Sequence, residues 1–329
     1  MRKVSTKKIT SIGGSALIEG IMMRGPKRTT VCVRTGENEI YSEDIKITTI
    51  PEKCKLFKLP LLRGIAGLID SMRLSYKSLM LSADKAVEAG EVEEEEPSKF
   101  EKWLDEKFGD KLVKVIMVFA SILGVALAVG LFFFLPSFLF DLTANVVPVF
   151  QGNGESAVFW KSVFEGVLKI ALFLGYIVLC SQMTEMKRVF MYHGAEHKTI
   201  FCYENEEELT VENVRKQIRF HPRCGTSFMV LMLIVGIVIG LFIPVAPFGI
   251  GFLRPVFKIL LLPVSCGIGY ELIKICGKHV NAFTRVIAAP GLWAQRITTK
   301  EPDDKMIEVA IEAMKAVIPD DGTDIINNK

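Results

Sequence analysis

The chain has 329 residues, of which 50% are hydrophobic and 23% charged, and its formal net charge is only +3. Its mean hydropathy of +0.34 is high for a soluble protein with this many charges, so we expect apolar segments inside a membrane and charged segments outside it. The small net charge argues against a general nucleic-acid binder. Seven cysteines, an odd number without a C-x-x-C pair, indicate a reducing compartment rather than a disulfide framework.

Residues 1–86 are expected to form a small α+β region outside the membrane. Their basic start is not followed by a long apolar run, so we expect no cleavable signal peptide. Residues 31–34 and 40–47 have the composition of two strands around a turn, which predicts a β-hairpin. Residues 19–26 mix polar and apolar side chains without a period, and we expect a specific loop there.

Between residues 61 and 80, apolar side chains recur at helical spacing and predict an amphipathic helix. They are Leu61, Ile65, Leu68, Ile69, Met72, Tyr76, Leu79 and Met80. Two interpretations are open, because such a helix either faces a protein core or lies on a membrane surface. Residues 87–111 are expected to be an acidic linker, densest in glutamate at 91–97, followed by a helix that precedes the membrane.

Four long apolar runs follow, each close to the roughly 20 residues that cross the hydrocarbon of a bilayer. They cover residues 112–135, 158–181, 227–246 and 252–276. The charged Lys161, Glu165 and Lys169 in the second run are expected near its outer end. The sequence therefore predicts a mainly α polytopic membrane protein, with about four transmembrane helices in residues 112–276.

The basic residues predict the orientation of these helices. The segment between the first two runs, residues 141–157, has no Lys or Arg, whereas the loop at 182–226 contains Lys187, Arg188, Lys198, Arg215, Lys216, Arg219 and Arg223. By the positive-inside rule, that loop and both termini belong in the cytoplasm, in the inner membrane of a bacterial cell. The cytoplasmic tail, residues 277–329, is expected to end in an amphipathic helix at 306–317.

The loop at 182–226 contains an H-x-x-E-H pattern at His193, Glu196 and His197. Positions i and i+4 share one face of a helix, so both imidazoles could hold one metal ion while Glu196 takes a proton from bound water. The inverzincins use this order of residues. His221 and Cys224 add an H-x-x-C pair, and imidazole with thiolate favours a divalent transition metal, above all Zn²⁺. The alternative is that these are ordinary polar residues on a solvated helix face.

The number of ligands decides what such a site does. Four His and Cys donors would close the zinc site as a structural clip, whereas three leave a position for water and make Glu196 a general base. Glu271, close to the cytoplasmic end of the fourth run, is a further candidate ligand, or it pairs with Lys274 or snorkels. A nucleophilic pair of Cys224 with His221 is another alternative.

Several local features around this site are also predicted. The helix of the second apolar run is expected to continue to Lys198, and Glu204 is expected to be a surface charge. Thr210 is expected to cap a short helix, because its hydroxyl can accept from the first turn. Gly194 and Gly225 are expected to permit close approach of the backbone.

Four segments of the chain resemble the bacterial DUF1385 family, which includes the YqhQ proteins. They are residues 13–25, 192–198, 219–227 and 290–299, and the resemblance extends from residue 11 to 317. It implies an integral membrane protein and a metal-dependent enzyme, and it implies no particular substrate.

The sequence thus favours a membrane-embedded metal-dependent hydrolase that acts on a peptide or a lipid-linked substrate near the bilayer surface. Its metal would be bound by His193, His197 and a third ligand, His221 or Cys224 rather than Glu271. The alternative is a non-catalytic scaffold or assembly factor with membrane-protein partners, in which a structural metal clips the second loop to the third span. A transporter is a third possibility, but four spans without a visible repeat make a poor pore.

Overall fold

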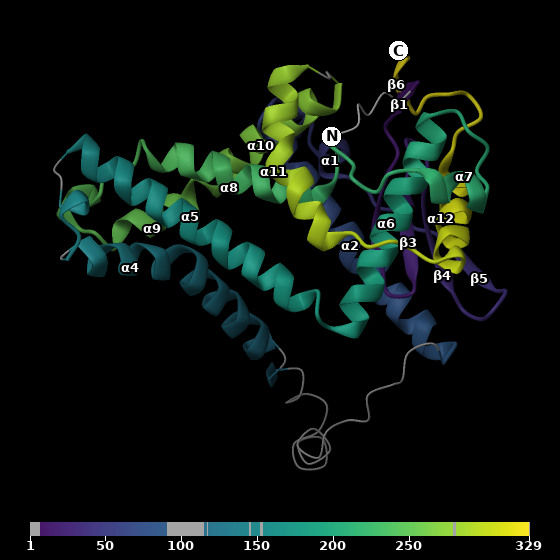
Figure 1. The fold of residues 1–329 in the computed structure, drawn as a ribbon, viewed down its shortest axis with the longest axis horizontal. Coiled ribbons are helices and arrows are strands. Elements are labelled where there is room, and N and C mark those ends of the chain that lie inside the picture. Colours follow the sequence, from purple (N-terminus) through teal and green to yellow (C-terminus); the bar gives the residue numbers. More distant parts are fainter. Residues whose placement is uncertain are drawn as a thin grey trace, which may run out of the picture. The chain divides into compact units, whose positions relative to one another are not determined.

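The computed structural model describes residues 7–90, 115–116, 118–144, 146–151, 154–278 and 281–328, and most of its elements are helices (Figure 1). The described residues fall into two compact units. The first lies within Met1–Val92, Phe173–Met232 and Pro263–Lys329, and the second within Glu93–Leu172 and Leu233–Leu262. The predicted acidic linker at 91–97 and the start of the first apolar run lie outside the described residues.

A four-stranded antiparallel sheet forms the N-terminal part of the first unit. Its strands follow the order β2 (Gly13–Leu17), β3 (Gly20–Arg24), β4 (Thr29–Arg34) and β5 (Ile40–Asp44). The predicted hairpin is confirmed as β4–β5, in which Cys32 lies opposite Ser42. The prediction of a loop at 19–26 is wrong, because residues 20–24 form β3, which pairs with β2 in a hairpin. Four of the five residues of β3 are buried, so this strand lacks the polar–apolar alternation that identifies a half-buried strand.

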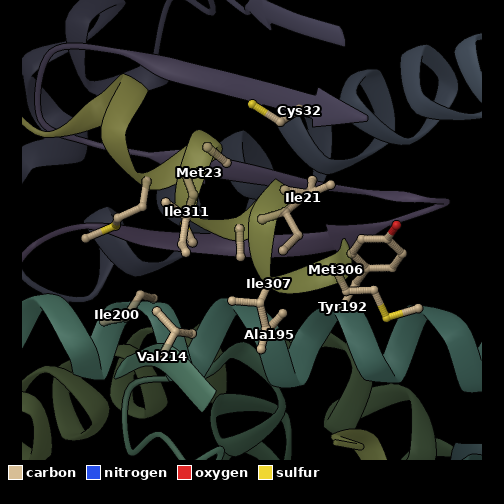
Figure 2. Packing of buried hydrophobic residues seen from close by; sticks show 14 of the residues in the cluster. Ile21, Met23, Cys32, Tyr192, Ala195, Ile200, Val214, Met306, Ile307 and Ile311 are labelled. Atoms are coloured by element: carbon tan, nitrogen blue, oxygen red, sulfur yellow. The ribbon is translucent and has the colours of Figure 1, made fainter. Parts of the chain in front are cut away.

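The C-terminal part of the chain packs against this sheet. Helices α6 (Thr184–Glu204) and α12 (Asp304–Val317) share one apolar core with β3 and β4. Figure 2 shows Ile21 and Met23 of β3, Ile307 and Ile311 of α12 and Ala195 of α6 meeting in it. The predicted amphipathic helix at 306–317 is therefore confirmed.

A two-stranded sheet and a short helix also pack against α6. Strand β1 (Lys8–Thr10) pairs antiparallel with β6 (Ile325–Asn328), which joins the two ends of the chain. Helix α7 (Val211–Lys216) follows Thr210, whose hydroxyl accepts from the backbone N–H of Asn213 at 3.3 Å, so the predicted N-cap is confirmed.

The predicted helix at 61–80 is confirmed as α2 (Leu62–Glu88), which follows α1 (Ile50–Lys53) and the short η1 (Lys55–Lys58). The face of α2 that packs on the sheet contributes Leu74 and otherwise small or polar side chains. Most of the apolar stripe that the periodicity identified lies on the other side of the helix and is exposed.

Two of the four predicted spans are helices long and apolar enough to cross a membrane, Val118–Ala144 and α5 (Glu155–Cys180). The first continues beyond the expected end at residue 135. It contains the wider π-type turn η2 (Gly130–Phe134) and then α4 (Leu135–Ala144), with Pro136 in its first turn. A proline lacks the N–H of a regular helix and crowds the preceding turn, and the wider turn accommodates both effects.

The other two predicted spans are less regular. Helix α8 (Gly225–Gly240) has 16 residues, and at 1.5 Å per residue it is only about 24 Å long, short of the about 30 Å of hydrocarbon in a bilayer. The fourth is divided into α9 (Leu253–Leu260) and α10 (Leu262–Lys278), with Pro263 at the start of the second piece. The described residues therefore contain two helices of spanning length, or three if the broken pair is one span.

Helix α5 does not continue to Lys198 as expected. The chain turns at residues 181–183, where the side chains of Ser181 and Gln182 both donate to the carbonyl of Val178 and so compete with the helical hydrogen bonds. Helix α6 begins after this turn. The remaining elements are α11 (Ala282–Thr298) and two short turns, η3 (Pro148–Phe150) and η4 (Pro247–Gly249).

Charged side chains within the apolar helices of the second unit pair with one another. Buried Lys161 contacts Asp141 at 2.5 Å, and buried Glu165 pairs with Lys258 and Arg254. Arg254 also donates to the carbonyl oxygen of Gly240, at the end of α8. These pairs explain how the second and fourth apolar runs accommodate ionisable residues, since a buried charge needs a partner.

Candidate metal centre

Helix α6 brings the three residues of the H-x-x-E-H pattern to one side. His193, Glu196 and His197 lie in its middle, and the last two are 5% and 1% exposed. The rings of His193 and His197 have centroids 4.4 Å apart. The prediction that this segment is helical is therefore confirmed. The alternative, that these residues lie on a solvated helix face, is wrong.

Cys224 completes a cluster of three donors. It immediately precedes the first turn of α8, and its Sγ lies 3.2 Å from Nε2 of His193. One ligand atom from each of His193, His197 and Cys224 can be chosen so that all three lie within 4.8 Å of one another. This is the only group of three or more His, Cys, Asp or Glu donors with metal-ligand spacing among the described residues.

Backbone carbonyls orient both imidazoles. Nδ1 of His193 lies 2.9 Å from the carbonyl oxygen of Thr298, and Nδ1 of His197 lies 2.5 Å from that of Arg219. A neutral ring that donates through Nδ1 keeps its lone pair on Nε2, the arrangement typical of metal-binding histidines. Nε2 of His197 is buried and has no hydrogen-bond partner in the described part of the chain. The donor set thus fits a zinc-type ion.

The charges within the cluster fit the same ion. Burial alone would raise the pKa of Cys224, but the adjacent His193 and His197 outweigh burial and lower that pKa well below its ordinary value. Burial lowers the pKa of His193, yet the facing Cys224 reverses this and raises it to about 9. Without an ion the pair is therefore a thiolate facing a protonated His193, and zinc, which binds the thiolate, would displace the proton from the His193 ring.

Glu196 lies beside the three donors and is held at one oxygen. The backbone N–H of Gly14, in β2, donates to its Oε1 at 3.0 Å, while its Oε2 is buried without a partner among the described residues. Burial raises the pKa of this carboxyl, and His197 and His193 oppose the rise only in part. One carboxylate oxygen is thus fixed and the other is available to accept a proton.

The structure does not bring His221 into the cluster. Its Nε2 lies 4.0 Å from Oε2 of Glu204, and burial followed by the charge of Arg223 lowers its pKa to about 4. Its ring is still near the site, because its centroid is 5.5 Å from that of His197. The neutral imidazole belongs to a buried polar network beside the donors.

Glu271 is also outside the cluster. Both of its oxygens accept from Arg63 of α2, at 2.6 and 2.5 Å. Of the alternatives left open for Glu271, an ion pair is the one observed, and its partner is a residue more than 200 positions away. Both carboxylate oxygens are occupied by one guanidinium, so the position of Glu271 is explained by this ion pair and needs no metal.

The expectation that Glu204 is a surface charge is wrong. Its side chain is 2% exposed, accepts from the backbone N–H of Thr10 at 2.9 Å, and forms an ion pair with Arg223. Periodicity could not reveal this burial, because both partners lie outside its helix.

Gln295 is a positioning residue that the sequence did not single out. It is fully buried in α11, accepts from the backbone N–H of His221, and donates to the His221 carbonyl and to the Ser227 hydroxyl. One amide thereby fixes both ends of the segment that presents Cys224. In the sequence, only its position in the last of the four segments that resemble a family indicated that Gln295 has a role.

Glu19 belongs to the first of the four segments that resemble a family, and its contacts show what that segment does in the fold. It lies in the β2–β3 turn with a positive φ of 49°, forms an ion pair with Arg188, and accepts from the hydroxyl of Tyr192 at 3.2 Å. It therefore attaches the hairpin to α6. The same hairpin supplies the Gly14 N–H that holds Glu196.

A cavity of about 1080 Å³ adjoins the cluster. It lies in the first unit and is lined by residues of β2, α2, α6 and the segment before α8, among them His193, Glu196, His197 and Cys224. Pockets that hold small ligands usually occupy about 300–1,000 Å³, so this one has room for a substrate as well as water.

Comparison with known proteins places these residues in a family. A family model described as "Protein of unknown function (DUF1385)" matches residues 59–320. The chain belongs to the DUF1385 family. It is 33% identical over 308 residues to "Uncharacterized protein YqhQ" of Bacillus subtilis (strain 168), which covers 93% of this chain and 92% of that protein. No solved structure matches the chain.

Proposed function

We propose that this member of the DUF1385 family is a metal-dependent hydrolase, in which His193, His197 and Cys224 hold Zn²⁺. The observation that carries the proposal is a pair of buried atoms that have no partner within the described part of the chain, Nε2 of His197 and Oε2 of Glu196, beside a cluster of three donors in one cavity. Three protein ligands are typical of catalytic zinc sites, in which the fourth position is open, whereas structural sites have four.

The residues have distinct roles in this proposal. When bound, Zn²⁺ supplies Lewis acidity and makes water a nucleophile near neutral pH. Glu196 accepts the proton from that water at Oε2, while the Gly14 N–H keeps Oε1 in place. The carbonyls of Thr298 and Arg219 hold the two imidazoles in the tautomer that binds metal.

We also propose that the chain crosses the bacterial inner membrane four times, with both termini and the metal centre in the cytoplasm. The contrast between the seven basic residues at 182–226 and their absence at 141–157 supports this orientation. Helix α8 and the broken pair α9–α10 would be the third and fourth spans. A peptide or a lipid-linked molecule near the membrane surface is the substrate class that suits a cavity of this size, which Tyr270 of the apolar α10 helps to line.

Metal content tests the centre directly. Purified wild-type protein should contain one transition-metal ion per chain by elemental analysis, and His193→Ala with His197→Ala should contain none. Glu271→Gln is the matched control, because Glu271 pairs with Arg63 rather than the donors, and it should retain the ion. Stoichiometric metal in the double variant would show that the ion binds elsewhere.

Glu196→Gln separates an enzyme from a scaffold. The substitution keeps the size of the side chain and removes its basicity, and loss of a general base typically slows a reaction about 10²- to 10⁴-fold. We therefore expect normal folding and metal content, but no complementation of cells that lack the native gene. Full complementation by Glu196→Gln, together with unfolding of Cys224→Ala, would favour a structural clip in a membrane scaffold.

A metal-free thiol hydrolase is a second candidate, favoured by the 3.2 Å contact between Cys224 and His193. Cys224 precedes the first turn of α8, and a helix N-terminus stabilises a thiolate. The two candidates differ in their response to a chelator. The zinc enzyme loses activity with the chelator and regains it with Zn²⁺, whereas the thiol enzyme is unaffected by the chelator and inactivated by iodoacetamide.

A further inference from the structure

Helix α2 has two faces of different character. One face lines the cavity of the metal centre, with Arg63, Gly67, Asp70, Ser71 and Leu74 at helical spacing. The other face exposes large apolar side chains: Ile69 (43%), Met72 (65%), Tyr76 (69%), Leu79 (41%) and Met80 (46%). At 100° per residue the two sets lie on opposite sides of the helix. The apolar face of α2 thus points away from the rest of the first unit. A helix that packs on a protein core has its apolar face turned inward instead.

We propose that α2 lies on the membrane surface, with this apolar stripe (Ile69, Met72, Tyr76, Leu79 and Met80) in contact with lipid. A contiguous row of exposed apolar side chains on one helix face is the feature of helices that lie in the plane of the bilayer interface. Tyr76, at the middle of the stripe, has the amphipathic ring that is enriched at this depth.

Contacts of α2 with a candidate span support lipid as the occupant. Gly64, in its first turn, packs closely against Gly267 and Tyr270 of α10, since a Cβ at Gly64 would lie 2.8 Å from the Cβ of Tyr270. The ion pair of Arg63 with Glu271 joins the same two helices. Helix α10 is half of the broken pair that is apolar enough to span a membrane. One end of α2 is therefore held at the level of the bilayer.

The charges around the stripe suit an anionic lipid surface. Residues 50–80 contain Lys53, Lys55, Lys58, Arg63, Arg73 and Lys77, against only two acidic residues, Glu52 and Asp70. Asp70 is buried and accepts from the backbone N–H of Ile50, so it does not face lipid. Basic side chains beside an apolar stripe are attracted to anionic headgroups.

This arrangement would place the cavity one helix diameter, about 10 Å, from the lipid surface. The proposal depends neither on the metal nor on hydrolysis, so its failure would be distinguishable from failure of the proposed function.

Photo-crosslinking in the full chain tests the proposal. The amino acid p-benzoylphenylalanine would be introduced at Met72 or Tyr76, and at Ser71 as the control, because Ser71 is exposed on the opposite face of the same helix. The protein would be reconstituted in nanodiscs of phosphatidylcholine and phosphatidylglycerol, irradiated, and digested, and lipid adducts would be measured by mass spectrometry. We expect lipid adducts at positions 72 and 76, at least several-fold above those at 71.

Each other outcome would overturn the proposal. Adducts from 72 and 76 to peptides of the same chain or of a second copy would identify a protein as the occupant. Equal lipid yields at 71 and 72, or no adduct at 72 and 76, would mean that the stripe is not in the bilayer. A second variant, Met72→Glu with Tyr76→Glu, should lower the lipid yield of a crosslinker at Leu79 several-fold, and an unchanged yield would also contradict the proposal.

Discussion

At Glu204, a carboxylate connects three parts of the first unit that are distant in sequence. It ends α6, accepts from Thr10 of β1, and pairs with Arg223 in the segment that presents Cys224. Burial raises its pKa, but His221 and Arg223 outweigh burial and lower the pKa of Glu204 below its ordinary value. The carboxylate is therefore charged at neutral pH and holds the donor segment against α6.

Glu204→Gln should destabilise the protein, because it leaves Arg223 without its charged partner. Loss of one member of a mostly buried ion pair costs about 3 kcal/mol of unfolding free energy. The matched control is Glu206→Gln, two residues further on and exposed, which should change stability by less than about 0.5 kcal/mol. Thermal unfolding in detergent would measure both, and equal melting temperatures for the two variants would contradict the network.

The same pair predicts a dependence on pH. A carboxyl whose pKa is lower in the folded state stabilises that state above the unfolded pKa, and the contribution disappears as the pH falls through the folded value. The difference in stability between wild type and Glu204→Gln should thus be constant above pH 4.5, the ordinary value for Glu, and shrink below it. Melting temperatures measured from pH 7 to 4 would test this, and a difference that grows on acidification would exclude the ion pair as its cause.

At the level of elements, the geometry of the candidate metal centre depends on how closely α6 approaches the segment after α11. The backbone N–H of Lys300 donates to the carbonyl of Phe190 at 2.8 Å, and a Cβ at Gly194 would lie 2.0 Å from the carbonyl oxygen of Lys300. Gly194 is therefore needed for close approach, as expected. Gly225 is not, since none of the described residues lies within 4 Å of a Cβ built there.

Gly194→Ala should consequently separate α6 from residues 298–302, displace the Thr298 carbonyl from His193, and lower both stability and metal content. Overpacking of this kind costs about 1–3 kcal/mol. Gly225→Ala, in the first turn of α8, adds a methyl group in open space and should leave stability unchanged or slightly higher. Melting temperature and elemental analysis of both variants would check the prediction, which fails if the two behave alike.

At the level of the whole molecule, the proposed topology can be tested by cysteine labelling in intact cells. Single cysteines would replace Glu155, at the start of α5, and Glu206, in the loop after α6, since both side chains are exposed. The exposed native Cys54 would first be replaced by serine. An impermeant maleimide should label position 155 from outside, and position 206 only after the membrane is permeabilised.

Labelling of position 206 but not of 155 in intact cells would reverse the orientation. Labelling of both positions in intact cells would place them on the same side of the membrane. That requires an even number of spans between them, so the segment would not cross once as proposed. The result also decides on which side of the membrane the metal centre lies.

Features that depend on neighbours a few residues apart could be predicted from the sequence. Helical spacing predicted α2, α6 and α12, and it predicted that His193 and His197 share a face, because 3.6 residues per turn fix that relation within any helix. The Thr210 cap and the β4–β5 hairpin are equally local. Long apolar runs indicated the membrane helices, although a break at Pro263 and the short α8 left two or three of spanning length rather than clearly four.

Only the tertiary structure decided which distant segments meet. Cys224 rather than His221 faces His193, because Gln295 of α11 holds the backbone on both sides of His221. Gly14 fixes Glu196 from 182 positions away. Periodicity shows which side chains share a face of a helix, but not what covers that face. The covering element is decided by packing between segments that are far apart in the sequence. For the same reason the apolar stripe of α2 was visible in the sequence, while its direction, away from the core, was not.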